Sequence, residues 1–98
     1  MKNLISDLNK AFENRVRLGI MSILMVNDDV DFNSIKETLN LTDGNLASHL
    51  KALEQQEIIV VSKQFIGRKP STTYNATEHG KDLFRRHLAA LEELISNQ

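Results

Sequence analysis

The sequence predicts a mainly α-helical fold with one small β-hairpin, an α+β arrangement in a single domain over residues 1–98. Apolar residues recur at helical spacing up to residue 55 and again from residue 77 to 96. Between them, residues 58–76 are rich in β-branched and aromatic side chains around a Gly/Pro break, which is typical of two paired strands. A core of this size is only marginally stable alone, so dimerisation would strengthen it.

Composition excludes several classes of function. The chain has no cysteine, which rules out a disulfide framework and thiolate metal sites, and His79 and His87 lack a second histidine at ligand spacing. It has no glycine-rich phosphate loop and no credible Ser/His/Asp set, so we expect no enzyme, no metal site and no cofactor. No apolar run approaches the roughly 20 residues that span a bilayer. The amino terminus reaches Asp7 too soon to hold the apolar region of a signal peptide. We therefore expect a cytoplasmic protein without membrane contact.

Three helices are expected before residue 41. Residues 4–12 and residues 14–26 each place apolar side chains on one helical face. Asp31 can cap the third helix, residues 31–40, through its side-chain oxygen. The apolar faces consist of Leu4, Ile5, Leu8, Ala11 and Phe12, then Val16, Ile20, Ile23 and Leu24, then Phe32, Ile35 and Leu39.

A fourth helix is expected at residues 42–55, where Thr42 is a good N-cap and leucines recur at 46, 50 and 53. His49 lies about 60° from this apolar stripe around the helix. The far side and flank carry Gly44, Asn45, Ser48, Lys51 and Gln55. This outer face is small, polar and nearly uncharged, whereas an ordinary solvated helix usually carries more Glu and Lys.

The hairpin at residues 58–76 has a basic tip. Arg68 and Lys69 lie between Gly67, which lets the backbone turn, and Pro70, which fixes one dihedral angle. Residues 63–74 contain three positive charges and no acid, although the formal net charge of the chain is −1. The hairpin therefore supplies positive charge that the rest of the chain lacks.

The last helix, residues 77–96, has an apolar stripe made of Phe84, Leu88, Leu91 and Ile95. A helix of about 19 residues is about 28 Å long at 1.5 Å per residue, more than a small domain can easily cover. The stripe could fold back on the core of its own chain, but we interpret it as a dimer interface.

Three motifs together carry a family resemblance: Leu-Thr-Asp-Gly-Asn-Leu at 41–46, His-Leu-Lys-x-Leu at 49–53 and Thr-Thr-Tyr-x-x-Thr at 72–77. From about Arg17 to about Leu91 the chain resembles winged helix-turn-helix regulators, in the small stand-alone branch near the MarR and ArsR families. The sequence departs from many relatives at Ala47 and Ser48, where they carry Ser-Arg, and at Gln56 and Glu57, where a glycine is usual.

The resemblance implies a role for each element. The 43–55 helix would be the recognition helix in the major groove of DNA, and the 65–71 segment would be the wing, along the phosphates or in a minor groove. The first helix, with Leu4 and Leu8, and the last helix, with its stripe, would pair across a two-fold axis.

Residue chemistry gives the predicted DNA contacts. Asn45 can bond adenine in two places, Ser48 suits several bases, and Gly44 exposes backbone N–H groups at a helix start. Arg68 suits a narrow minor groove. The full set is Arg17, Gly44, Asn45, Ser48, His49, Lys51, Lys63, Arg68 and Lys69.

Plainer roles stay open for several of these residues. The two basic tip residues could form a solvated turn, and Asn45 and Ser48 could be ordinary helix-surface residues, with a capping bond as a further role for Asn45. His49 could pack at the edge of the leucine stripe instead of bonding a phosphate. Arg17 could pair with Glu13 or Asp31.

The sequence thus predicts a homodimeric DNA-binding transcriptional regulator, most simply a repressor that reads a palindromic operator. The alternative is a winged-helix protein–protein interaction module that does not bind DNA. A small apolar effector between the hairpin domain and the terminal helices, or a regulatory protein, could switch it.

Overall fold

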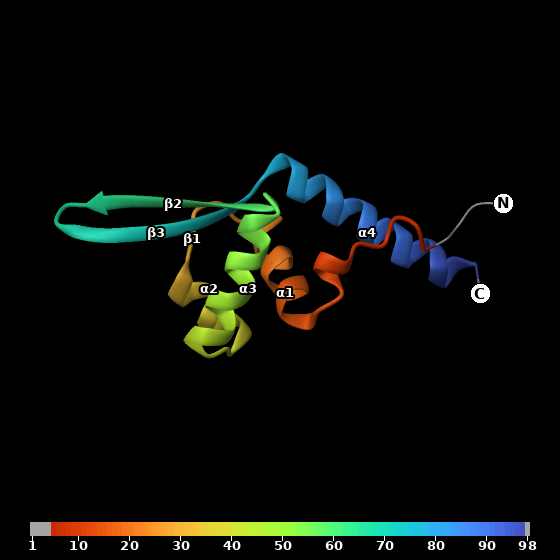
Figure 1. The fold of residues 1–98 in the computed structure, drawn as a ribbon, viewed down its shortest axis with the longest axis horizontal. Coiled ribbons are helices and arrows are strands. Elements are labelled where there is room, and N and C mark those ends of the chain that lie inside the picture. The colour runs from red at the N-terminus through yellow and green to blue at the C-terminus, as the bar shows by residue number, and fades with distance from the viewer. Residues whose placement is uncertain (1–4, 98) are drawn as a thin grey trace.

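The computed structural model describes residues 5–97 and confirms the predicted fold class (Figure 1). Three short helices form a body from which the β-hairpin projects on one side and a long C-terminal helix on the other. The described elements are a 3₁₀ helix η1 (Lys10–Phe12), helices α1 (Arg15–Leu24), α2 (Phe32–Leu39), α3 (Asp43–Gln55) and α4 (Glu78–Ser96), and strands β1 (Val30–Asp31), β2 (Ile59–Ile66) and β3 (Lys69–Ala76). None of the described helices is long and apolar enough to cross a membrane.

Each α-helix begins at a polar residue whose side-chain oxygen accepts a backbone N–H bond from its first turn. The four N-caps are Asn14, Asp31, Thr42 and Thr77. These bonds satisfy donors that have no partner inside the helix, and a good cap stabilises a helix by about 1 kcal/mol. α2 ends at Asn40, whose φ of 54° is left-handed, as is common where a helix stops.

The hairpin is part of a three-stranded antiparallel sheet in the order β1-β3-β2. β1 pairs Val30 with Tyr74 and Asp31 with Thr73 on the edge of β3 away from β2. Next to it, the Asp29 backbone N–H donates to Asn75 Oδ1 (2.8 Å), and Asn75 Nδ2 donates to Asp29 Oδ1 (2.9 Å). The sequence predicts only the two strands of the hairpin, because a strand of two residues is too short to show an alternating pattern.

The predicted helix at 4–12 is wrong for the residues that the structure describes. Residues 5–7 form a turn, and the regular structure is the 3₁₀ helix at Lys10–Phe12. Asn9 accounts for the difference, because its side chain accepts the Ala11 N–H (2.9 Å) and so competes with helical backbone bonding. Leu4 lies outside the described residues, and Leu8 is half-buried.

The hydrophobic core joins one face of every α-helix to the base of the hairpin. It consists of Ala11, Phe12, Val16, Ile20, Met21, Leu24, Ile35, Leu46, Leu50, Leu53, Ile58, Ile59 and Phe84. Phe84 is only 2% exposed, and its ring meets Phe12 edge-on at 5.0 Å between centroids. This corrects the prediction that Phe84 belongs to a dimer interface, since its ring is used within its own core.

His87 anchors the N-terminal segment on α4. Its ring is 3% exposed, lies edge-on to Phe12 and accepts the Asn9 backbone N–H at Nδ1 (3.0 Å). Burial lowers the pKa of His87 below its ordinary value of 6.5, and the nearby Glu13 carboxylate opposes that effect. The accepting Nδ1 must be unprotonated, so this contact belongs to the neutral imidazole.

We expect the protein to lose stability as the pH falls below 6.5. A histidine with a lowered pKa binds a proton more readily in the unfolded chain, so acid favours unfolding, and the contribution of His87 is complete only above 6.5. His87→Gln keeps an acceptor but does not titrate, so its unfolding free energy should depend less on pH. Urea unfolding from pH 7 to pH 5 measures this, with His79→Gln, an exposed residue of α4, as the control. Equal pH slopes for His87→Gln and the unchanged protein would contradict the assignment.

Candidate nucleic-acid interface

α3 buries its leucine stripe and turns a small polar face outward. Leu46, Leu50 and Leu53 are buried, while the predicted contact residues Gly44, Asn45, Ser48 and Lys51 are all exposed. The N-cap bond runs from the Asn45 backbone N–H to Thr42 Oγ1 (3.2 Å), so the cap uses the backbone of Asn45 rather than its side chain.

An ion pair crosses the turn between α2 and α3. Lys36 Nζ lies 2.8 Å from Asp43 Oδ1, and the Asp43 side chain is 74% exposed. Lys36 thus offsets the negative charge of Asp43 at the start of α3. Exposed ion pairs of this kind contribute at most about 1 kcal/mol to stability.

Arg17 and His49 are bonded to each other. Arg17 Nε donates to His49 Nδ1 (3.0 Å), which links α1 to the middle of α3. Burial first, and the Arg17 charge second, lower the pKa of His49 below 6.5, in keeping with a neutral ring that accepts. The pairing that the sequence suggested for Arg17 was with Glu13 or Asp31, and the 32-residue separation of Arg17 and His49 gives no signal for this bond.

The tip of the hairpin is a two-residue turn formed by Gly67 and Arg68, between the paired residues Ile66 and Lys69. Gly67 has a φ of 65°, and Arg68 does not have a positive φ, which is the pattern of a type II′ turn with glycine first. Arg68 and Lys69 are both exposed. The backbone therefore holds the two charges at the far end of the hairpin, away from α3 (Figure 1).

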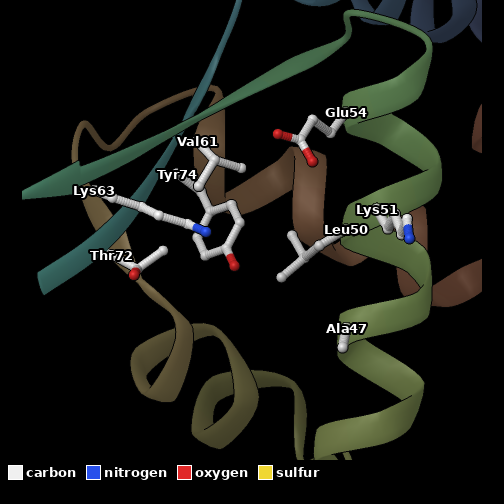
Figure 2. A pocket seen from close by; sticks show the side chains of 8 residues that line it. All are labelled: Ala47, Leu50, Lys51, Glu54, Val61, Lys63, Thr72 and Tyr74. Atoms are coloured by element: carbon white, nitrogen blue, oxygen red, sulfur yellow. The ribbon is translucent and has the colours of Figure 1, made fainter. Parts of the chain in front are cut away.

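A cleft of about 460 Å³ separates α3 from the base of the hairpin (Figure 2). It is lined by Ala47, Leu50, Lys51 and Glu54 of α3 and by Val61, Lys63, Thr72 and Tyr74 of the strands. Two predicted contacts from different elements, Lys51 and Lys63, therefore line one cleft. Burial, and next the Glu54 carboxylate, raise the pKa of Tyr74 above 10.0, so its hydroxyl stays protonated and can donate at neutral pH.

Lys63 and the two acids nearest the hairpin lie on different faces of the sheet. Lys63 lies on the face toward α3, which is the face that lines the cleft. On the opposite face a second hollow is lined by Gln64, Ile66, Ser71 and Thr73 together with the acids Asp29 and Asp31. Lys63 and these two acids thus lie on opposite faces of the sheet, whereas Lys69, which pairs with Ile66 at the tip, shares the face of the acids.

The comparisons decide the family. The family model described as a winged helix DNA-binding domain matches residues 16–95. The chain belongs to this family. Helices α1 to α3 with the β2–β3 wing and α4 make up the matched region, so every predicted DNA contact from Arg17 to Lys69 falls inside the winged helix domain.

Two relatives are identical to this winged helix protein at about a third of the aligned residues. An uncharacterized protein of Methanocaldococcus jannaschii is 35% identical over 88 residues, which are 90% of this chain and 96% of that protein. The solved structure of a transcriptional regulator homologue from Pyrococcus horikoshii is 32% identical with a TM-score of 0.84, over 96% of this chain and 91% of that one.

The structural neighbours of this winged helix protein include a putative MarR-like transcription regulator from Bacillus cereus, with 15% identity, a TM-score of 0.71, and coverage of 96% of this chain and 70% of that one. Another is the MepR–DNA complex from S. aureus, with 15% identity, a TM-score of 0.67, and coverage of 93% of this chain and 70% of that one. At 15% identity this likeness concerns the fold alone.

Proposed function

We propose that this winged helix protein is a homodimeric transcriptional repressor that binds a palindromic DNA operator. The observation that carries the proposal is the shared cleft, because it puts Lys51 of α3 and Lys63 of the wing on one surface that can face a duplex. Membership of a DNA-binding family and likeness to a transcriptional regulator homologue support a DNA-binding regulator. In this role the protein acts by occupying DNA and not by catalysis.

We assign base reading to the exposed face of α3. Asn45 would bond an adenine edge and Ser48 a neighbouring base, while the open backbone at Gly44 would let a phosphate approach the helix start. Apart from the adjoining backbone of α3, nothing lies within 4 Å of where a Gly44 side chain would begin, so the surface is open on that side of the helix start. Arg17 uses Nε to bond His49, so the Nη groups of its guanidinium would be the donors that meet a phosphate.

We assign dimerisation to α4. Leu88, Leu91 and Ile95 are 44%, 37% and 75% exposed on a helix that projects away from the body (Figure 1). Leu8, which is half-buried, stays a candidate partner in the N-terminal segment. Two copies joined by α4 would present two α3 faces to half-sites about one helical turn, about 34 Å, apart.

Selection of bound duplexes from random DNA tests the proposal as a whole. We expect an enriched inverted repeat whose half-site centres are about 10 base pairs apart or a multiple of that. Enrichment of single, unpaired half-sites would contradict the symmetric dimer. Failure to enrich any sequence would contradict specific DNA binding.

The Arg68→Ala/Lys69→Ala double variant tests the wing. Each lost phosphate contact should lower the slope of log affinity against log salt by about 1, so we expect a slope shallower by up to about 2 and weaker binding at all sequences. Fluorescence anisotropy of a labelled operator at several salt concentrations measures both quantities. The control, Lys81→Ala/Arg85→Ala, removes the same charge from α4 and should leave the slope unchanged. Equal slopes for the wing variant and the unchanged protein would show that the tip does not touch DNA.

The second candidate function is a protein-interaction module. The observation in its favour is the charge of α3, which carries one lysine, Lys51, and two acids, Asp43 and Glu54. In that role the α3–wing cleft would hold a protein segment, and selection from random DNA would enrich nothing. Regulation by a small apolar effector or a partner protein is compatible with both functions.

A further inference from the structure

The tip of the wing carries two exposed apolar side chains. Phe65 is 76% exposed and Ile66 is 70% exposed, immediately before the Gly67–Arg68 turn. Exposed apolar residues on a projecting two-stranded ribbon favour aggregation, and soluble proteins usually protect such segments. A contact that uses these side chains would account for them.

The pairing register places the two side chains on opposite faces of the ribbon. Phe65 pairs with Pro70, and because strand residues alternate, it shares a face with Lys63, which lines the cleft toward α3. Ile66 lies on the other face with Gln64, beside the hollow that contains Asp29 and Asp31. Phe65 is therefore on the side that the proposed function turns toward DNA.

The register places Pro70 directly opposite Phe65. Residues 66 and 69, which flank the two-residue turn, form the hydrogen-bonded pair of the ladder, so Phe65 and Pro70 form the next, non-bonded pair. In such a pair the backbone N–H groups point outward, so the missing N–H of Pro70 costs no ladder bond. The proline ring stiffens the strand opposite Phe65.

We propose that Phe65 inserts its ring between two base pairs from the minor groove and bends the operator at that step. Apolar side chains, phenylalanine among them, act as such wedges when cationic side chains hold the adjacent backbone. Arg68 and Lys69 supply those cations within four residues, Lys69 from the opposite face of the ribbon. The acids Asp29 and Asp31 line the hollow on that opposite face, away from Phe65. This inference rests on the proposed function and adds to it a residue that selects DNA by its deformability.

Insertion of Phe65 would require an easily unstacked base-pair step at a defined place in the operator. Pyrimidine–purine steps such as TA and CA unstack most easily, so one such step should recur at each outer edge of the inverted repeat, where the wing tips would lie. Replacing that step by a stiff A-tract step should weaken binding although no hydrogen bond to the bases is lost.

The test compares Phe65→Ala with Ile66→Ala, its neighbour of similar exposure on the opposite face. The selected operator carries 2-aminopurine at the outer step and a donor–acceptor dye pair at its two ends. For the unchanged protein and Ile66→Ala we expect brighter 2-aminopurine and a shorter end-to-end distance on binding. Phe65→Ala should lose both signals and bind about tenfold more weakly, as expected when a stacking ring is removed. Phe65→Trp, which keeps an aromatic ring, should restore them.

Each other outcome has a definite meaning. Normal binding by the unchanged protein without a 2-aminopurine or distance change overturns the wedge and leaves the proposed function standing. The wedge is also overturned if the Phe65→Ala variant still changes the 2-aminopurine fluorescence and the end-to-end distance on binding. A change in sedimentation of Phe65→Ala with unaltered DNA binding would assign the tip to a protein contact. Failure of the unchanged protein to bind any selected duplex removes the wedge together with the proposed function.

Discussion

Gly80→Ala is expected to lose about 3 kcal/mol of unfolding free energy, at the upper end of the usual cost of overpacking. A Cβ atom at Gly80 would lie 2.0 Å from the backbone oxygen of Ile58 and 2.8 Å from its carbonyl carbon. Non-bonded atoms do not approach this closely, and a backbone oxygen cannot rotate away as the end of a flexible side chain can. Urea unfolding followed by circular dichroism measures the change.

The surrounding bonds explain why the structure cannot easily relax. Ile58 O already accepts the Thr77 backbone N–H (3.0 Å), and Thr77 Oγ1 donates to Glu57 O (2.7 Å) while it accepts the Gly80 N–H (2.9 Å). Moving α4 away from Ile58 to admit a methyl group would break this set, which joins the end of the wing to the start of α4. The same displacement would disturb the packing of Phe84 one turn later.

Gly44→Ala is the matched control, because it adds the same methyl group in the first turn of another helix. Its Cβ would meet nothing within 4 Å, so we expect the general preference of helices for alanine to apply, a gain of about 0.5–1 kcal/mol. Destabilisation of both variants by the same amount would show that the Ile58 contact is not the cause. A Gly80→Ala protein as stable as the unchanged chain would contradict the close approach itself.

Leu91→Glu is expected to weaken operator binding by about 10²–10⁴-fold, because the two half-sites would no longer be bound by one linked particle. Leu91 lies in the middle of the exposed stripe on α4, and a buried carboxylate at a symmetric apolar interface would face its own copy. Sedimentation should show a dimer for the unchanged protein and a monomer for the variant at equal concentration. Operator affinity is measured on the same samples by fluorescence anisotropy.

Ala89→Glu is the control for that experiment. Residue 89 is also exposed on α4 but lies about 160° around the helix from residue 91, so the same charge is placed away from the stripe. We expect it to stay dimeric and to bind normally. An unfolding measurement on Leu91→Glu separates loss of the dimer from loss of the fold. A folded, dimeric Leu91→Glu protein that binds normally would place the interface elsewhere.

The sequence predicted the structure correctly where a short stretch of chain fixes it, as at helix caps and at the hairpin turn. Thr42 and Thr77 begin α3 and α4, Asp31 caps α2, and the Gly67 turn closes the hairpin. The predicted N-terminal helix was wrong where Asn9 bonds its own backbone, and β1 was missed because its pairing partners lie more than 40 residues away. The spacing of apolar residues shows which face of a helix or strand is buried, but it cannot identify elements of only two or three residues.

In the candidate site, too, features set by neighbouring residues were predicted, while those set by distant residues were not. The sequence alone showed that the 43–55 helix presents a small polar face and that Arg68 and Lys69 form a basic tip. The predicted stripe on α4 is divided in the structure, since Phe84 packs into the core against Phe12 while Leu91 stays exposed.

The sequence by itself determined α1 to α4, the caps of α2, α3 and α4, and the basic hairpin, because helix caps and turns depend on residues close together in the chain. Only the tertiary structure decided that Arg17 bonds His49, that Lys51 and Lys63 line one cleft, and that Phe65 lies on the α3 side of the wing. Those contacts join residues that are far apart along the chain. Their geometry is set by how the helices and the sheet dock on the shared core, which no local pattern encodes.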